Sequence, residues 1–337
     1  MTYRTRILYF ILLQLLISQL YAQDPVMSHF YANATQLNPS LAGIEGPAKI
    51  YIGYRNQWPN TGSSFVTYQA SYDQYIDKIQ GGIGLRMLND RHGNGVFNAY
   101  NLDAMYAYQF YASRRLMISG GLQAGVGQRS FNSSSLEFGD TFNPVTGLYT
   151  TNSLDNVPGY RKFYPDFATG ISAFYDNLYG GIAVHHLLNP VVTELNEAES
   201  VGISNGNRLT RRYTAHVGAI FSIIERRRGR ELMKLSPNLV FIQQLNVQQI
   251  NYGLDMIYRD FLLGLWTRHD IVFNYGNIIF NVGYSTNNIR FRYSYDVKIS
   301  SPAIRLPNMG AHEISLLIIY ENLNKRNKRR TIKCPKI

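Results

Sequence analysis

The feature that most constrains this sequence is an alternation of apolar and polar residues with a period of two, repeated along most of the chain. The stretch NNIRFRYSYDVK, residues 287–298, places the aromatic residues Phe291 and Tyr295 on one side of Arg290 and Arg292. Because successive side chains of a strand point to opposite faces, this segment has one apolar and one charged face. The alternation fits a half-buried soluble strand, and it also fits a membrane strand with lipid outside and water inside.

Segments of about eight to twelve residues with this pattern recur about fourteen times along the chain. An even number of strands of roughly this length is typical of bacterial outer-membrane barrels. The expected strands begin near Lys49, Ser64, Gly81, Phe97, Leu116, Asp166, Leu178, Arg212, Leu235, Gln249, Phe261, Val272, Ile289 and His312.

The lengths of the connections provide a stronger test of a barrel. In a chain that enters from the periplasm, short periplasmic turns alternate with longer outer loops. The second, fourth, sixth, tenth and twelfth connections are short, whereas the long ones, near residues 129–165, 186–211 and 297–311, all fall on the outer side. This sorting predicts an all-β fold: an antiparallel transmembrane β-barrel of about fourteen strands, with periplasmic termini and long outer loops.

The N-terminus has the three parts of an export signal. Arg4 and Arg6 precede the apolar run ILYFILLQLLISQL, which is shorter than the ~20 residues of a spanning helix, and cleavage is expected after Ala22. The only cysteine is Cys334, so no internal disulfide is expected. These observations predict a protein of the Gram-negative outer membrane. Its expected parts are a signal peptide at 1–22, a periplasmic or plug-like segment at 23–47, the barrel at 48–320 and a basic periplasmic tail at 321–337.

The formal net charge of +11 raises the question of a nucleic-acid partner. Much of the excess lies in two runs, ERRRGR at 225–230 and KRNKRR at 325–330, which fall on the expected periplasmic side. Neither run is interleaved with the aromatic residues on which a single-strand binder stacks bases. We therefore expect no nucleic-acid partner, and we interpret the two runs as solvated turn and tail.

No residue spacing typical of an enzyme or a metal site is found. His185 and His186 are adjacent, so in a regular strand they face opposite sides, and joining His216 in a metal site would require contacts across strands. The glycine-containing segments at 81–87 and 119–127 lack the Gly-Lys-Ser/Thr ending of a phosphate loop. In strands they are expected to relieve crowding where a barrel wall bends. The sequence predicts no enzyme, no metal and no cofactor.

Charged residues on the polar faces of the strands are expected to face the lumen. Such a lumen either conducts water and solutes or is filled by protein, and its ions can also pair with one another and brace the wall. The lumen-facing candidates are Arg290, Arg292, Asp296, Asp255, Arg268 and Arg86.

Several motifs resemble the PorP/SprF family, Bacteroidota outer-membrane proteins associated with type IX secretion and gliding motility. They are QDPVMSHFYANATQLNPSLAG (23–43), YRNQWP (54–59), LNDRHG (88–93), RFRYSYD (290–296) and HEISLLIIY (312–320). The resemblance spans nearly the whole chain after the signal. The residues of its N-terminal motif are Asn38, Pro39, Ala42, Gly43, Tyr54, Arg55 and Trp58.

The resemblance implies a barrel without enzymatic activity that anchors, or helps to export, a large cell-surface adhesin. The adhesin's C-terminal secretion domain is the expected contact, and a periplasmic OmpA-like, peptidoglycan-binding protein and outer-membrane lipid are further expected partners. The alternative is a diffusion porin or solute-uptake channel. The turn formers Asn38 and Pro39 indicate that the NPSLAG element is not part of the wall, so we expect it on the periplasmic side or inside the barrel.

Overall fold

The structure is a computed structural model that describes most of the chain after the expected signal peptide. The signal peptide at 1–22, the basic run at 226–230 and the basic tail at 321–337 lie outside the described residues. The described ranges are 24–59, 64–133, 142–143, 148–149, 159–193, 208–225, 231–271, 276–299 and 310–320.

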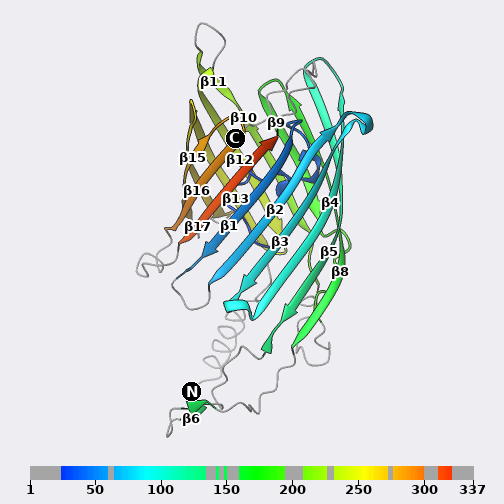
Figure 1. The fold of residues 1–337 in the computed structure, drawn as a ribbon, viewed down its shortest axis with the longest axis vertical. Helices are drawn as coiled ribbons and strands as arrows, with labels where there is room; N and C mark the ends of the chain where they lie inside the picture. Colours follow the sequence, from blue (N-terminus) through cyan, green and yellow to red (C-terminus); the bar gives the residue numbers. More distant parts are fainter. Residues whose placement is uncertain are drawn as a thin grey trace, which may run out of the picture.

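The described residues are almost entirely β-strands (Figure 1). Short helical turns occur at α2 (Ala34–Leu37), η1 (Pro39–Leu41), η2 (Asp77–Ile79) and η3 (Gly93–Gly95). The strands are β1 (Ala48–Gln57), β2 (Phe65–Ile76), β3 (Gly81–His92), β4 (Phe97–Tyr111), β5 (Leu116–Phe131), β8 (Tyr160–Tyr175), β9 (Leu178–His185), β10 (Arg212–Ala219), β11 (Phe221–Glu225), β12 (Glu231–Gln244), β13 (Val247–Tyr258), β14 (Phe261–Asp270), β15 (Asn277–Ser285), β16 (Ile289–Lys298) and β17 (Ala311–Tyr320), with a separate hairpin of β6 (Phe142–Asn143) and β7 (Leu148–Tyr149).

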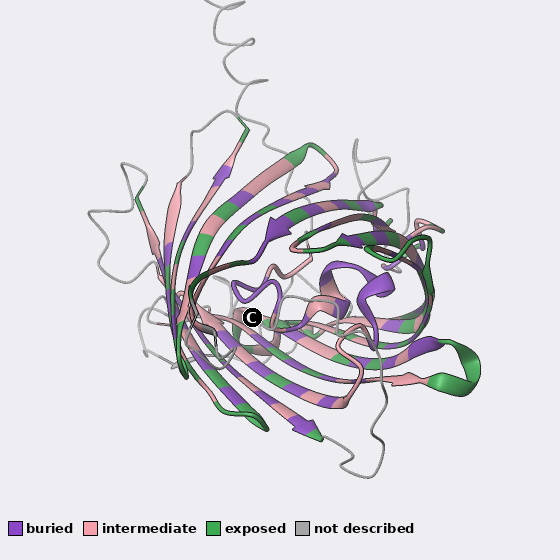
Figure 2. Cartoon of the chain, turned by 90° about the horizontal axis from the view of Figure 1, so that it is seen from above, coloured by how far each residue is buried: buried purple, intermediate pink, exposed green. Residues whose placement is uncertain are grey.

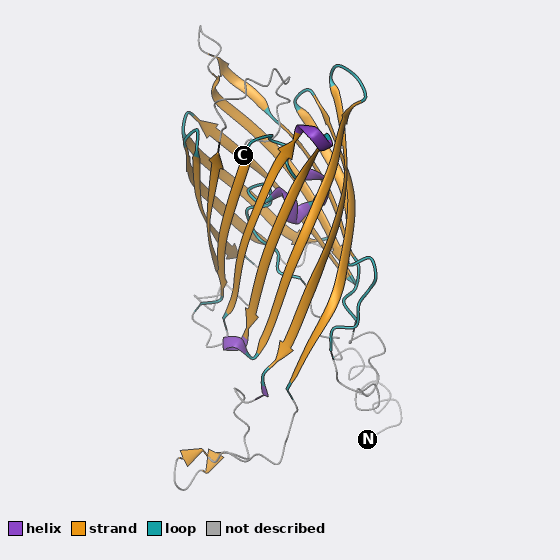
Figure 3. Cartoon of the chain, turned by 45° about the vertical axis from the view of Figure 1, so that its right-hand side comes forward, coloured by secondary structure: helices purple, strands orange, loops and turns teal. Residues whose placement is uncertain are grey.

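One antiparallel sheet closes on itself. Sequential strands pair as neighbours, β1 also pairs with β17, and β10 pairs with β12, which closes the ring. β10 and β11 are consecutive pieces of one strand interrupted at Ile220, so the barrel has 14 strands. Tilted strands form a tall cylinder with α2 and η1 inside it, whereas η2 and η3 lie in turns at its rims (Figures 2 and 3). The predicted antiparallel barrel of about fourteen strands is confirmed.

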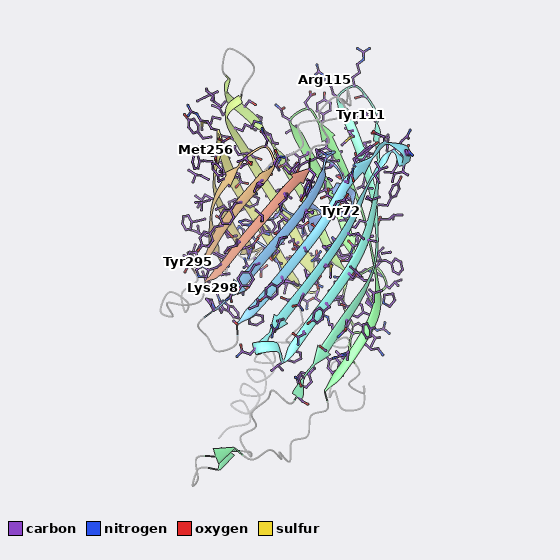
Figure 4. The ribbon with its side chains drawn as sticks, in the orientation of Figure 1. Tyr72, Tyr111, Arg115, Met256, Tyr295 and Lys298 are labelled. Carbon is purple, nitrogen blue, oxygen red and sulfur yellow. The ribbon has the colours of Figure 1, made fainter. Side chains whose placement is uncertain are left out.

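The two ends of the barrel differ as the connection lengths predict. β1 begins and β17 ends at the end with the short turns, which is the upper end in Figure 1. Tyr111 and Arg115 mark this short-turn end in Figure 4, whereas Tyr295 and Lys298 lie at the opposite, long-loop end. We take the short-turn end as periplasmic and the long-loop end as the outer mouth, following the usual asymmetry of such barrels.

The wall is inverted relative to a soluble protein, with apolar side chains outside and polar ones inside. Leu122, Phe163 and Ile182 are more than half exposed, whereas Glu313 and Asn251 are fully buried. Residues 287–298 follow the same rule in β16. An outward apolar surface of this kind is expected only where lipid replaces water, so the alternation describes a membrane strand.

Three strands begin away from their expected positions. β8 starts at Tyr160 and not near Asp166, because the ladder with β5 continues through Pro165, a residue that usually ends a strand. β12 starts at Glu231 and not near Leu235. β15 starts at Asn277 and not near Val272, which lies outside the described residues.

The barrel wall is not equally high on all sides. β4, β5 and β8 have 15, 16 and 16 residues, whereas β1, β16 and β17 have 10 each. The long strands reach further toward the long-loop end, which is the lower end in Figure 3, and project there beyond the other strands. This projecting part of the wall is here called the raised rim. Within the described ranges, no helix has the length and apolar character needed to cross a membrane.

Candidate functional site

Residues 24–47 form a segment, here called the N-terminal plug, that lies inside the barrel (Figure 2). Asp24 contacts His186, just after the long-loop end of β9, whereas Glu45 contacts Lys49 at the short-turn start of β1. The plug therefore runs from the outer mouth to the short-turn end, where it continues into β1. The first strand begins and the last strand ends at the short-turn end, but the first described residues of the chain lie at the opposite mouth.

The NPSLAG element ties the plug to two strands. The Asn38 Oδ1 accepts hydrogen bonds from the Ser40 backbone N–H at 3.0 Å and from the Ser40 hydroxyl at 2.7 Å, which caps η1. The Asn38 Nδ2 donates to the backbone carbonyl oxygens of Ile171 in β8 and Ile182 in β9, at 3.2 and 3.1 Å. One fully buried amide thus closes the turn and fixes it to the wall.

Wall glycines make room for the plug backbone. A Cβ on Gly121 would lie 2.2 Å from the Ser40 nitrogen, and a Cβ on Gly82 would lie 1.9 Å from the Ala42 carbonyl oxygen. Neither approach is possible for a residue with a side chain. From the sequence we expected these glycines to relieve crowding where the wall bends. Their close contacts with the plug give a different reason for glycine at these positions.

Apolar side chains of the plug pack into the middle of the lumen. Phe30 contacts the Trp266 ring with centroids 5.4 Å apart, and Tyr31 meets the Tyr179 ring edge-on at 5.5 Å. Leu41 belongs to the same buried cluster. Aromatic pairs of this geometry stabilise beyond their buried area. The plug is therefore a packed core element and not a loosely tethered tail.

A group of ionised side chains, here called the central charge cluster, joins the plug to β1, β14, β16 and β17. Arg55 pairs with Asp296 at 2.9 Å and with Glu313 at 3.2 Å, and Arg268 pairs with Asp296 at 3.1 Å. The Ser28 hydroxyl donates to Asp296 at 2.8 Å, and the Ser28 backbone N–H donates to Glu313 at 2.6 Å. Each buried carboxylate is thus satisfied partly by the wall and partly by the plug.

A second cluster, here called the mouth latch, holds the start of the plug at the outer mouth. The Asp24 carboxylate lies 2.6 Å from the His186 Nε2 and 3.2 Å from the Arg212 guanidinium. The His186 Nδ1 lies 2.9 Å from Asp166 in β8, and Arg129 of β5 lies 3.8 Å from Asp24. Three basic residues of the barrel, His186, Arg212 and Arg129, therefore surround one plug carboxylate, and Asp166 holds His186 from behind.

The mouth latch shifts the titration of both its central groups. Burial alone would lower the pKa of His186, but the Asp24 carboxylate and hydrogen bonds with Asp166 and Asp24 raise it to about 9. Burial alone would raise the pKa of Asp24, but His186, then Arg212 and Arg129, hold it well below its usual value. Both groups are thus charged at neutral pH and attract each other.

The mouth latch is expected to loosen in alkali. A raised histidine pKa contributes stability that is complete below about pH 6.5 and is lost as the pH rises through about 9. The depressed Asp24 pKa makes a contribution that is lost only in acid. In purified protein carrying Cys334→Ser, a cysteine introduced at Pro25 should react faster with a thiol reagent at pH 10 than at pH 7.5.

The reaction rate of a Leu188→Cys reporter, exposed in the outer loop, corrects for the greater reactivity of any thiol in alkali. The rate ratio of the two cysteines should rise with pH. It should already be high at pH 7.5 when Asp24→Asn is added. A ratio independent of both pH and Asp24 would contradict a latch at this position.

A third group of ions closes the short-turn end of the lumen. Lys49 lies 3.3 Å from both Glu45 and Asp73, and Arg290 lies 3.2 Å from Glu45. Asp73 also accepts a hydrogen bond from the Gly43 backbone N–H at 2.9 Å. Gly43 has a φ of 66°, a left-handed conformation that glycine adopts without strain. The plug is thus held at both ends and in the middle.

The other lumen-facing candidates lie on the inner face of the wall. Arg86 donates to Asp103 of the neighbouring strand at 2.7 and 3.0 Å, and Asp255 accepts from the Trp266 indole at 3.0 Å. Arg292 is buried and inward. Pairing within the wall and pairing with the plug, which the sequence leaves as alternatives, therefore both occur in the lumen.

The remaining residues of the N-terminal motif have different positions. Tyr54 points away from the lumen and contacts the Tyr68 ring, with centroids 5.3 Å apart. Trp58 follows β1 at the outer mouth with a φ of 57°, and its ring meets Phe65 edge-on at 5.1 Å. The motif is therefore not one site, because Asn38, Ala42 and Arg55 fix the plug whereas Trp58 lies at the mouth.

The three histidines that the sequence raised as possible metal ligands, His185, His186 and His216, contact the plug. His186 has a φ of 57°, which interrupts the strand alternation, so both His185 and His186 are buried. His185 approaches the Leu37 carbonyl oxygen at 3.3 Å, and His216 approaches the Asn38 amide at 3.4 Å. Among the described residues, no group of three or more His, Cys, Asp or Glu side chains is placed to hold a metal.

Sequence reasoning missed several residues that fix the plug. Ser28 and Asp24 carry no pattern, because their partners are more than 160 positions away in the chain. Glu313 carries a weak signal, since it is the one carboxylate in a strand of mostly apolar residues. Pairing of this kind depends on the register of the closed sheet, which sequence alternation does not specify.

Between the plug and the outer mouth lies a cavity of about 780 Å³, here called the vestibule. Asp24, Pro25 and Val26 of the plug line it together with Arg55, Arg268 and Asp296 of the central charge cluster, and the outer ends of the surrounding strands complete the lining. Most of its side chains are polar. They include Gln57, Asp90, Gln248, Gln249, Asp270 and Asn277.

A family model described as type IX secretion system membrane protein PorP/SprF matches residues 19–318. The chain belongs to the PorP/SprF family. The predicted family and the outer-membrane location are thereby confirmed, and the barrel is a membrane protein of the type IX secretion family. Among curated proteins no match is found.

Several solved structures of outer-membrane proteins are similar to this PorP/SprF barrel. Omp33 of Acinetobacter baumannii is 8% identical with a TM-score of 0.46, covering 82% of this chain and 100% of its own. The P. putida toluene transporter TodX is 11% identical with a TM-score of 0.45, covering 86% and 94%. A KdgM porin is 6% identical with a TM-score of 0.35, covering 80% and 99%.

Proposed function

We propose that this PorP/SprF barrel anchors, or helps to export, a large cell-surface adhesin of the type IX secretion and gliding system. The adhesin's C-terminal secretion domain is the proposed contact. The observation that carries the proposal is the occupied lumen: a segment of the chain's own N-terminus lies along it and is tied to the wall at both ends. The plug occupies the lumen that a diffusion channel would need, and it leaves the outer loops around the mouth to contact the partner.

The proposal assigns no chemical step to the protein. The ionised side chains of the lumen are used in pairing with one another and with the plug, so they act as a brace. Outer loops near the vestibule are suited to contact a large exported partner, because loops at a rigid rim adapt to what they bind. A periplasmic OmpA-like, peptidoglycan-binding protein is a further proposed partner at the short-turn end.

The competing function is a diffusion porin or uptake channel, which the charged lumen favours. A porin would need the plug to leave the lumen, breaking the central charge cluster and the mouth latch together. Steady conductance of the purified wild-type protein in planar bilayers would support the porin and count against an occupied lumen.

Deleting the gene is expected to remove one specific adhesin from the cell surface while general type IX secretion continues. Surface proteins can be compared by protease shaving of intact cells followed by mass spectrometry. A plasmid copy of the wild-type gene is the control and should restore the missing adhesin. Unchanged display of every type IX adhesin in the deletion strain would refute the proposed function.

A further inference from the structure

Six aromatic side chains follow one another along the inner face of the outer rim, here called the aromatic arc. Each comes from the outer end of a different strand or from the residue directly after it, in the order of the strands around the barrel. The six are Trp58 after β1, Phe65 of β2, His92 of β3, Phe97 of β4, Phe131 of β5 and Tyr160 of β8.

The rings of the arc form two groups of three, in which neighbouring rings are in contact. Ring centroids are 5.1 Å apart for Trp58 and Phe65 and 4.7 Å for Phe65 and His92. They are 4.8 Å apart for Phe97 and Phe131. His92 and Phe97 are register partners in the β3–β4 ladder, so the two groups of rings lie on adjacent strands. With strands about 4.8 Å apart, the arc spans roughly 24 Å.

The arc faces the mouth and not the membrane. Phe131 shares the inward alternation of Arg129, which contacts the plug, and Phe65 shares that of the buried Thr67. Phe97 remains 48% exposed on this inward side because the raised rim extends beyond the plug. Aromatic residues that lie inside a barrel mouth cannot serve as a lipid girdle, so another role is needed for them.

Strained and hydrogen-bonded groups hold the vestibule end of the arc in place. Trp58 is a bulky residue with a φ of 57°, and its backbone N–H donates to the Gly310 carbonyl oxygen at 2.9 Å. Asp90 accepts a hydrogen bond from the Thr67 hydroxyl at 2.7 Å and contacts the His92 ring. Strain of this kind in a bulky residue is concentrated at functional sites.

The polar lining beside the arc indicates the class of ligand. A pyranose ring presents C–H groups on its face and hydroxyls around its edge, so it stacks on an aromatic face while hydrogen bonding to amides and carboxylates beside it. Gln57, Gln248, Asn277 and the carboxylates Asp90 and Asp270 provide such partners in the vestibule. The vestibule volume of about 780 Å³ lies within the range of small-ligand sites.

The charge of the vestibule favours an uncharged ligand. Its lining includes three basic residues (Arg and Lys) and four aspartates, and the plug and wall already pair most of them. A polypeptide strand is disfavoured because Gln57 at the rim is already paired on both sides, with Ala311 and with Phe65. No sheet edge is therefore free for strand addition at this part of the rim.

We propose that the vestibule and the aromatic arc form a binding site for a neutral, linear oligosaccharide at the cell surface. One end of the chain lies in the vestibule against Trp58, and the following sugar rings lie along Phe97, Phe131 and Tyr160. The site is independent of the proposed adhesin contact, because it uses the inner face of the rim and not the outer loops.

Tryptophan fluorescence of the purified full-length barrel tests this site, since the chain has only two tryptophans and Trp266 is buried under the plug. Titration with maltohexaose and with cellohexaose should change the fluorescence saturably for at least one of them, with a Kd of about 1 mM or tighter. Trp58→Phe should abolish the signal while isothermal titration still detects binding.

Phe97→Ala should weaken binding about tenfold, as expected for loss of one stacking ring. The matched control is Phe163→Ala, which removes an outward-facing aromatic near the same rim and should leave the affinity unchanged. Retained heat-modifiable mobility on gels shows that each variant is folded. No saturable change with either hexasaccharide, equal weakening by Phe163→Ala, or saturation only with an aromatic hexapeptide would overturn the proposal.

Discussion

Gly121→Val is expected to drive the N-terminal plug from its seat and to open the barrel to ions. A Cβ at this position would lie 2.2 Å from the Ser40 nitrogen and 2.5 Å from the Pro39 carbonyl carbon, which are backbone atoms that cannot rotate away. Overpacking of this kind typically costs about 1–3 kcal/mol, and here the cost falls on the contact between plug and wall. In planar bilayers the variant should show frequent open steps, whereas the wild type should stay closed.

The neighbouring glycine on the same strand provides a matched control. Gly120 faces outward, and a Cβ added there would meet nothing within 4 Å. Gly120→Val should therefore stay closed and keep the wild-type resistance to heat in detergent. If Gly121→Val does not assemble, Gly121→Ala provides a smaller perturbation at the same site. A Gly121 variant as closed and as heat-resistant as the wild type would show that the plug does not depend on this contact.

Arg55→Ala is expected to be the most destabilising single change in the central charge cluster. The substitution removes the ion pairs to Asp296 and Glu313, two carboxylates that are almost completely buried. Arg268 still pairs with Asp296, but Glu313 would keep only hydrogen-bond donors of the plug. Breaking a buried pair on one side typically costs about 3–5 kcal/mol, which should lower the unfolding midpoint in denaturant markedly.

Arg115→Ala is the matched control for an ion pair in water. Arg115 lies 3.6 Å from Asp176 at the short-turn end, with side chains 70% and 51% exposed. Exposed pairs contribute little, so this variant should unfold at nearly the wild-type denaturant concentration. Similar midpoints for the two alanine variants would mean that the central charge cluster does not stabilise the barrel.

The sequence predicted the wall of this barrel well, because the wall repeats a local pattern. Ile289 and Phe291 face outward and Arg290 and Arg292 inward in β16, as alternation requires. The predicted start of β8 near Asp166 was wrong. A proline usually ends a strand, but here the ladder with β5 continues through Pro165. Local sequence signals thus predict the alternation within a strand more reliably than the residues at which the strand begins and ends.

The aromatic arc could not be predicted from any one segment. Phe65, Phe97 and Phe131 each look like an ordinary strand-end aromatic, and only the closed sheet aligns them on one rim. The same is true of the mouth latch, in which Asp24 meets His186 across 162 positions of chain. Contacts of this kind depend on register and closure, which involve every strand at once.

By itself, the sequence determined a fourteen-strand outer-membrane barrel and its two different ends. It could do so because alternation, strand number and connection length are local quantities that a membrane barrel restricts tightly. Only the tertiary structure decided that residues 24–47 enter at the outer mouth and fill the lumen, leaving the aromatic arc above them. That outcome depends on Asn38, Arg55 and Asp24 finding distant partners, and the energies of such contacts exist only once the ring of strands has closed.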